Sequence, residues 1–282
     1  MVFAVIGGDA RQAELARLLE EDGHTLRRFA LGGETDCATV GETVENADCV
    51  ALPMPVCART GVLNTPLSEK RFALDTVLDA LRPGQILVGG RVDADTAAAA
   101  AARGLYIADI LQNEALAVGN AVATAEGAVE RLLRETPVTL WRSRMLVLGY
   151  GRIGRLLCRR LAAFGAHVSA AARKPEDQVW IEAEGFGALE IRALSGLERF
   201  DVVVNTVPAR VLSETELRAL RRDALLLELA SAPGGFDPAA AERLGLHVIR
   251  APGLPGKTAP RTAAALLRDC IYGILEERDG KA

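Results

Sequence analysis

The stretch Arg144–Lys174, RMLVLGYGRIGRLLCRRLAAFGAHVSAAARK, decides the fold of this chain. An apolar run at 145–148 leads directly into GYGRIG at 149–154, and apolar residues then recur every three to four positions. A glycine at 165 precedes a second apolar run at 167–172. This order predicts a strand, a glycine turn, a helix and a second strand. In that context G-x-G-x-x-G indicates a dinucleotide-binding turn.

Each glycine of the turn has its own physical role. Gly149 allows the tight turn, Gly151 lets the backbone approach a pyrophosphate, and Gly154 lets the helix pack close to the strand. The free N–H groups and the positive dipole end of the helix favour phosphates. The predicted phosphate-binding residues are Gly149, Tyr150, Gly151, Arg152, Ile153 and Gly154. The alternative is a tight turn in a Rossmann-like domain that binds no nucleotide.

The residues after the second strand indicate which dinucleotide binds. An NAD site usually has an acidic residue there to hold the ribose 2′-hydroxyl. This chain has Arg173 and Lys174 instead, and the first acid is Glu176. Two cations suit a 2′-phosphate, and Arg152 would add a third positive contact. We therefore predict NADP rather than NAD, the alternative being that Arg173 and Lys174 form a solvated strand end.

Composition excludes several classes of protein. Of the 282 residues 50% are hydrophobic, but only 4% are aromatic and the net charge is −4, which disfavours a nucleic-acid partner. The five cysteines form no C-x-x-C and no metal-like spacing, so we expect reduced thiols and no metal site. No apolar run is long enough to span a membrane and no signal peptide is expected, which predicts a soluble, cytoplasmic chain.

Beyond the glycine turn, apolar runs typical of buried strands alternate with helical patterns. This alternation predicts an α/β fold with parallel sheets and right-handed crossovers. We expect two Rossmann-like, doubly wound parallel-sheet domains joined by a long connector helix at Asn113–Thr136. A single apolar stripe over Pro260–Glu277 predicts a C-terminal helix that folds back on the first domain.

The predicted domain boundaries follow from these elements. A substrate-side domain comprises residues 1–118 with 260–282, and an NADP-binding domain comprises residues 119–259. Within the first domain we expect a long loop at Cys57–Ser68, a type of loop that is often functional, and a helix at Lys70–Leu81.

Ligands of open parallel sheets bind outside the carboxyl ends of the strands. Glycine-rich and proline-rich strand ends bring backbone N–H groups close to a ligand, and such groups bind carboxylates well. On the cofactor side this selects Thr206, Val207, Pro208, Ala230 and Ser231. On the substrate side it selects Gly8, Asp9, Pro53, Met54 and Gly256. The alternative for each is turn chemistry alone.

The three histidines are informative by their position. His24, His167 and His247 all stand where a strand begins, the wrong end of a doubly wound sheet for catalysis. A 2-hydroxy-acid dehydrogenase needs an acid–base group at the hydroxyl, typically a histidine. Hydride transfer without a strong histidine base is therefore favoured, and oxidation of a cyclic enamine or imine toward an aromatic ring fits this requirement.

Three other polar residues are candidates for chemistry. Lys257 lies in a predicted Gly-Lys-Thr loop and would hold a substrate carboxylate or relay a proton; a solvated lysine is the alternative. Asn120 and Thr124 are four residues apart on the connector helix, so they share a face. Glu126 is turned away from that face, which favours a hinge or ion-pair role for it.

Six segments together resemble the A subunit family of dipicolinate synthase. They are VIGGDARQ (5–12), NAVATAEG (120–127), GYGRIG (149–154), NTVPA (205–209), LASAPGG (229–235) and PGLPGKTAPRT (252–262). The resemblance runs nearly end to end. It implies oxidation of dihydrodipicolinate to pyridine-2,6-dicarboxylate by NADP during sporulation, in complex with a flavoprotein-like B subunit. The chain is also similar to the NAD-binding domains of hydroxyacid dehydrogenases and of adenosylhomocysteinase.

Two other functions stay open at this point. One is a non-catalytic subunit that binds NADP and supports a partner, which the missing acid–base histidine also suits. The other is an ordinary 2-hydroxy-acid dehydrogenase. For the proposed enzyme we expect a small dicarboxylate substrate, a homo-oligomer and a B-subunit partner.

Overall fold

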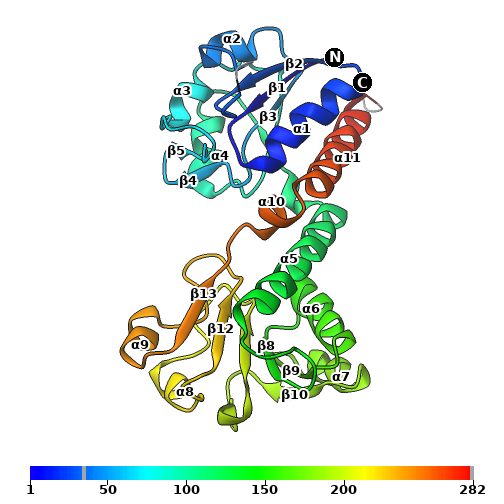
Figure 1. Cartoon of the computed structure of the whole chain (residues 1–282). Coiled ribbons are helices and arrows are strands. Elements are labelled where there is room, and N and C mark those ends of the chain that lie inside the picture. Colours follow the sequence, from blue (N-terminus) through cyan, green and yellow to red (C-terminus); the bar gives the residue numbers. More distant parts are fainter. Residues whose placement is uncertain (34–35, 280–282) are drawn as a thin grey trace. The chain divides into compact units, whose positions relative to one another are not determined.

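The computed structural model describes residues 1–33 and 36–279 (Figure 1). The chain forms two compact units. The first unit comprises Met1–Gly119 and Ala259–Ala282, and the second comprises Asn120–Thr258. Each unit is built around its own parallel sheet covered by helices, so the predicted α/β class with two Rossmann-like layers is confirmed. Helix α5 (Glu114–Glu135), the predicted connector, begins in the first unit and ends in the second.

The first unit has a five-stranded sheet in the order β2-β1-β3-β6-β7, with every pair parallel. The central strand is fully buried, as its apolar sequence requires. Strand order reverses between β1 and β3, so a crevice at the carboxyl ends of these two strands is the topological site for a ligand. The strands are β1 (Val2–Ile6), β2 (Thr25–Phe29), β3 (Cys49–Ala51), β6 (Ile86–Gly89) and β7 (Ile107–Asp109).

Several helices of the first unit, though not the one at Leu74–Leu78, start at a residue whose side chain caps them. Asp9 and Gln12 form a capping box at α1, and Asp93 accepts a bond from the Thr96 N–H at the start of α4. The helices are α1 (Ala10–Glu21), α2 (Val40–Val44), α3 (Leu74–Leu78), α4 (Ala94–Ala101) and α11 (Pro260–Asp279), with a 3-10 turn η1 (Ile110–Gln112).

The C-terminal helix completes the core of the first unit. Leu267 and Ile271 of α11 are buried in one apolar cluster with Leu15 and Leu19 of α1. Near the start of α11, Leu266 lies so close to Gly119 that a Cβ on this glycine would be 2.3 Å from its Cδ1. The prediction that this helix folds back on the first domain is therefore confirmed.

Two predictions for residues 57–81 are wrong. The expected loop contains an antiparallel hairpin of β4 (Cys57–Arg59) and β5 (Val62–Leu63), and the expected helix is limited to α3. The hairpin explains the late start of α3, because the Leu63 N–H donates to the Phe72 carbonyl (2.9 Å) and the Leu74 N–H donates to the Gly61 carbonyl (2.9 Å). A backbone that pairs with a strand at 72–74 cannot also be helical there.

The second unit has a six-stranded parallel sheet in the order β10-β9-β8-β11-β12-β13. Apolar clusters cover both faces of this sheet. Its strands are β8 (Arg144–Leu148), β9 (His167–Ala172), β10 (Gly187–Glu190), β11 (Val202–Asn205), β12 (Leu225–Glu228) and β13 (His247–Arg250). Its helices are α6 (Arg152–Ala163), α7 (Pro175–Ala183), α8 (Glu214–Arg218), α9 (Pro238–Arg243) and α10 (Leu254–Thr258), with a 3-10 turn η2 (Leu197–Arg199). Within residues 1–33 and 36–279, no helix is both long and apolar enough to cross a membrane.

The packing of α11 makes a stability prediction. Leu267 is 1% exposed, so Leu267→Ala should destabilise the first unit by about 2–5 kcal/mol, the usual cost of such a cavity. Urea unfolding followed by far-UV circular dichroism should show the shift. Fluorescence should not, since Trp141 and Trp180 both lie in the second unit.

The exposed Leu133 provides the control for this experiment. Leu133→Ala is expected to change stability by no more than about 0.5 kcal/mol. An unshifted circular dichroism transition for Leu267→Ala would show that α11 is not part of the core of the first unit.

Candidate functional site

The strand order of the second unit reverses between β8 and β11, and ligands of doubly wound sheets bind at this point. The two strands are joined there by hydrogen bonds from one residue. Both the backbone N–H (2.9 Å) and the hydroxyl (2.8 Å) of Thr206 donate to the Leu148 carbonyl. The predicted Gly149 and Thr206 are thus held together at the crevice.

The glycine turn has the geometry that the sequence predicts. Gly149 has φ +95°, a backbone conformation that favours glycine. A Cβ on Gly154 would lie 2.1 Å from the Gly149 carbonyl oxygen, so only glycine lets α6 begin this close to β8. A Cβ on Gly151 would meet no protein atom within 4 Å, and Gly151, the N-cap of α6, has no side chain to cap the helix. This helix start fits the pyrophosphate of a dinucleotide, because backbone N–H groups at a helix N-terminus bind anions.

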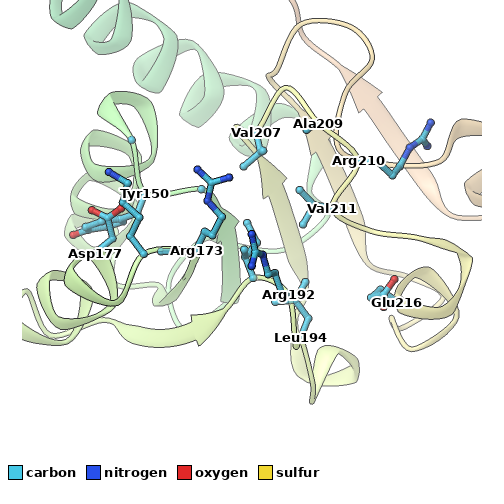
Figure 2. A pocket seen from close by; sticks show the side chains of 15 residues that line it. Tyr150, Arg173, Asp177, Arg192, Leu194, Val207, Ala209, Arg210, Val211 and Glu216 are labelled. Atoms are coloured by element: carbon cyan, nitrogen blue, oxygen red, sulfur yellow. The ribbon is translucent and has the colours of Figure 1, made fainter.

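A pocket of about 580 Å³ adjoins this turn (Figure 2), a volume typical of a small-molecule site. Six of the predicted cofactor residues line it: Gly149, Tyr150, Gly151, Arg173, Lys174 and Val207. The other predicted cofactor residues are absent from its lining: Arg152, Ile153, Gly154, Thr206, Pro208, Ala230 and Ser231. The pocket therefore extends from the ends of β9 and β10, past the glycine turn, to the segment that follows β11.

The charged residues of the pocket are mainly cationic. Besides Arg173 and Lys174, the lining includes Arg192 and Arg210, which sequence reasoning missed. Arg192 lies near Arg173 because β10 pairs with β9 and the Ile191 N–H donates to the Ala172 carbonyl (3.2 Å). This pairing between strands is not visible in the sequence.

Both acidic residues of the pocket have partners within the same unit. Asp177 accepts a bond from Arg155 (2.8 Å), and Glu216 accepts the backbone N–H (2.8 Å) and the hydroxyl of Ser213. Arg210 lies 3.8 Å from Asp237, whereas Arg173 forms no ion pair with any described residue. The pocket therefore offers positive charge to an anionic ligand.

Arg155 holds the glycine turn against α7. It donates to the Tyr150 carbonyl (3.1 Å) and to Asp177 (2.8 Å), and its guanidinium lies 5.2 Å from the centre of the Tyr150 ring. The Tyr150 side chain is 4% exposed, and this burial raises the pKa of its hydroxyl to about 12. Tyr150 is therefore a neutral packing residue beneath the turn at physiological pH.

Two buried polar side chains, Asn205 and Glu228, lie on the β11 and β12 side of the reversal of strand order. Each is the last residue of its strand, β11 and β12. The Asn205 amide donates to the Glu228 carboxylate (2.6 Å), which also accepts the N–H groups of Ala230 (3.0 Å) and Gly235 (2.7 Å). The signal in the sequence is a polar residue ending an otherwise apolar strand, VVVN and LLLE.

In the first unit, the predicted substrate-side residues gather at the carboxyl ends of β1 and β3. Arg11 joins them: it pairs with the Asp9 carboxylate (2.7 and 2.8 Å) and donates to the Met54 carbonyl (2.9 Å). The Gly8 N–H donates to the Asn64 carbonyl (2.8 Å), and the Pro53 carbonyl accepts the Gly90 N–H (3.2 Å). The buried Arg11 neutralises Asp9, which would otherwise repel an anionic substrate.

The residues around α5 and α10 form a separate group. The stretch predicted as a loop folds as the short helix α10, which leaves Gly256 buried and Lys257 exposed. The Thr124 hydroxyl donates to the Asn120 carbonyl (2.7 Å), while the buried Asn120 Oδ1 has no hydrogen-bond partner. Of the two roles expected for Glu126, a hinge or an ion pair, the structure shows an ion pair with Arg160 (3.1 Å).

The described parts of the chain contain no candidate metal site and no histidine at the carboxyl end of a strand. No cluster of three or more potential metal-ligating acidic, histidine or cysteine side chains occurs within residues 1–33 and 36–279. The three histidines lie at the amino ends of β2, β9 and β13, as predicted.

Comparison with known proteins establishes the family. Residues 2–111 match the N-terminal domain of the A subunit of dipicolinate synthase, and residues 112–234 match the NAD-binding domain of D-isomer-specific 2-hydroxyacid dehydrogenases. The chain is 31% identical to the dipicolinate synthase A subunit of Bacillus subtilis (strain 168), over 98% of this chain and 96% of that protein. The chain belongs to the family of dipicolinate synthase A subunits.

Solved structures agree with this assignment. The dipicolinate synthase A chain of Bacillus subtilis superposes with a TM-score of 0.85 at 30% identity, over 100% of this chain and 98% of that one. Its counterpart from Bacillus halodurans gives 0.84 at 27% identity, over 97% of each chain. D-lactate dehydrogenase of Escherichia coli shares the fold, with a TM-score of 0.65 at 14% identity over 99% and 98% of the two chains. The protein is thus an oxidoreductase with a nicotinamide dinucleotide cofactor.

Two glycine substitutions should separate packing from ligand binding. Gly154→Ala is expected to destabilise the second unit by about 1–3 kcal/mol, since its Cβ meets the Gly149 carbonyl oxygen. Gly151→Ala adds its Cβ to open space and should leave the melting temperature unchanged. It should nevertheless weaken dinucleotide binding about tenfold or more by keeping the phosphates from the N–H groups.

Differential scanning fluorimetry and calorimetric titration with dinucleotide would measure these two effects. Unchanged dinucleotide affinity in Gly151→Ala would mean that the phosphates do not approach this turn.

Proposed function

We propose that this chain oxidises dihydrodipicolinate to dipicolinate with NADP as the hydride acceptor. The observation that carries the proposal is the open glycine turn beside a cationic pocket, in a chain related over 98% of its length to a dipicolinate synthase A subunit. When bound, NADP⁺ would supply the hydride acceptor: the substrate ring would lose one hydride to it and one proton to solvent, and would become an aromatic pyridine.

For the cofactor, we assign the pyrophosphate to the turn Gly149–Gly154. Thr206, Val207 and Pro208, after β11, and Ala230 and Ser231, after β12, are assigned to the ribose and nicotinamide. These positions follow from the reversal of strand order between β8 and β11. The 2′-phosphate of NADP is assigned to Arg173 and Lys174, joined by Arg192 on the neighbouring strand end. Charge-assisted bonds from such cations are strong and favour NADP over NAD.

For the substrate, we assign the first unit as the binding side. Gly8, Asp9, Pro53 and Met54 surround the crevice at β1 and β3, where Arg11 offsets the charge of Asp9. Within the second unit, Gly256 and Lys257 are proposed to bind a carboxylate, and Asn120 and Thr124 to make polar contacts. Asn120 Oδ1, buried without a partner, suits a ligand that donates a hydrogen bond.

The chemistry of this substrate suits a site without a histidine base. Aromatisation of the ring supplies driving force, so loss of the ring proton needs no strongly basic side chain. The chain then has to bind and orient the two reactants, which accounts for much of the acceleration in reactions of this type.

A second candidate is a non-catalytic subunit that binds NADP for a partner. It is favoured by the position of all three histidines at strand beginnings and by the name of the relative, which calls it one subunit of a synthase. We propose a homo-oligomer of this chain, with a flavoprotein-like B subunit for its partner. A third candidate, an ordinary 2-hydroxy-acid dehydrogenase, is favoured by the family matched at residues 112–234.

Turnover by the purified chain distinguishes these functions. Supplied with dihydrodipicolinate and NADP, it should produce NADPH absorbance at 340 nm, and Gly151→Ala should be much slower. Activity that appears only after a B subunit is added would support the non-catalytic candidate instead. Simple 2-hydroxy acids, offered in parallel, should give no NADPH.

The cofactor preference is tested at Arg173. Arg173→Ala is expected to raise the Kd for NADPH by about ten- to hundredfold, the value of a hydrogen bond between charged groups, and to leave the Kd for NADH nearly unchanged. Arg222→Ala removes an exposed arginine of the same unit that does not line the pocket, and serves as the control. If the wild-type chain binds NADH as tightly as NADPH, the assignment of NADP is wrong.

A further inference from the structure

Glu228 is a buried carboxylate to which the proposed function assigns no role. Its side chain is 5% exposed and adjoins Asn205, which is fully buried on the neighbouring strand. Taking a carboxylate out of water is costly unless hydrogen bonds or a cation compensate. An apolar residue at position 228 would avoid this cost of desolvation. A buried glutamate there is therefore better explained by a role in ligand binding than by stability alone.

The carboxylate is held by dipoles rather than by a cation. Its three partners are all N–H donors: the Asn205 amide (2.6 Å) and the backbone N–H groups of Ala230 (3.0 Å) and Gly235 (2.7 Å). Among the described residues, no lysine, arginine or histidine forms an ion pair with it. Both oxygens of the carboxylate accept at least one N–H donor. Glu228 thus places a negative charge inside the unit with no side-chain cation to neutralise it.

The surrounding loops are shaped to enclose this pair. A Cβ on Gly234 would lie 2.8 Å from Glu228 Oε2, and a Cβ on Gly235 would lie 2.4 Å from the Asn205 amide carbon. Asn205 in turn donates to the Val207 carbonyl (2.9 Å) and accepts the Val207 N–H (3.1 Å). One buried pair therefore fixes the backbone after β11 and after β12 together.

The loops after β11 and β12 are the ones assigned to the nicotinamide side of the cofactor. The nicotinamide ring is the part of the cofactor whose charge changes in the reaction. The oxidised nicotinamide ring carries a positive charge and the reduced ring is neutral. At an effective dielectric constant of about 20, opposite unit charges about 10 Å apart attract by an energy equal to roughly a tenfold change in affinity. A buried anion beneath these loops attracts only the oxidised ring.

We propose that Glu228 is a positioning and electrostatic residue that makes the site favour NADP⁺ over NADPH. This inference rests on the proposed function, because it assumes that the dinucleotide lies along the carboxyl ends of β8, β11 and β12. A preference for NADP⁺ over NADPH suits an enzyme that has to bind the oxidised cofactor and release the reduced one after each turnover.

The test is the ratio of the two dissociation constants, Kd(NADPH)/Kd(NADP⁺), measured by calorimetric titration of the full chain. Glu228→Gln keeps the size of the side chain and removes its charge, but its NH2 group replaces one acceptor oxygen. The lost hydrogen bond should weaken both cofactor forms alike, whereas the lost charge should lower the ratio about five- to tenfold through weaker NADP⁺ binding. Glu228→Asp keeps the charge and disturbs the hydrogen bonds. It should weaken both forms similarly and preserve the ratio.

Glu242→Gln is the matched control, since it removes an exposed carboxylate of the same unit. Equal weakening of both cofactor forms by Glu228→Gln would overturn the electrostatic role and leave only loop geometry. An unchanged ratio with unchanged affinities would overturn both roles.

The wild-type chain provides a measurement that does not depend on whether a variant folds. It should bind NADP⁺ at least as tightly as NADPH, and NADPH binding more than about tenfold tighter would overturn the inference. If neither form binds, the proposed function fails and this inference with it. If both bind and the ratio contradicts these expectations, this inference alone fails.

Discussion

The contact between Gly154 and the Gly149 carbonyl is the constraint on which the second unit depends. A single added methyl group would lie 2.1 Å from that oxygen, so glycine is what allows α6 to start directly over the end of β8. The start of α6 therefore lies at the reversal of strand order, with Gly151, which has no side chain, as its N-cap. Thr206 ties β11 to the same strand end through the Leu148 carbonyl. Helix, turn and crevice follow from one close approach of two backbones.

Both units fix the carboxyl ends of their strands with buried polar groups. In the first unit, Arg11 joins Asp9, after β1, to the Met54 carbonyl, after β3. In the second, Asn205 and Glu228 join the loops after β11 and β12. Apolar packing holds the strands together, but it cannot determine the path of a loop, because the hydrophobic effect is not directional. Hydrogen bonds to buried side chains supply that direction, and loops at these positions are where ligands bind.

Local patterns predicted most of the fold and part of the site. The glycine turn, the strands and the helices α5, α6 and α11 follow from spacing along the chain. The hairpin at 57–63 was missed because its closure depends on backbone bonds to Phe72 and Leu74. Arg192 was missed for a similar reason: only the pairing of β10 with β9 brings it near Arg173. The spacing of apolar residues within one segment predicts a strand or a helix, but it does not show which strands pair. Contacts that depend on strand pairing therefore cannot be predicted from it.

Charge along the proposed cofactor site matches the charge along an oxidised dinucleotide. Arg173, Lys174 and Arg192 lie where β9 and β10 end, and they suit the anionic phosphate end. Glu228 lies where β12 ends and suits the cationic nicotinamide. The two groups of charges are held differently: the cations are exposed and adaptable, whereas the carboxylate is buried and fixed by three N–H donors. Exposed charges are screened by salt and buried ones much less. Under the proposed assignment, binding at the phosphate end would therefore weaken with rising ionic strength, while the preference at the nicotinamide end for one oxidation state would stay nearly constant.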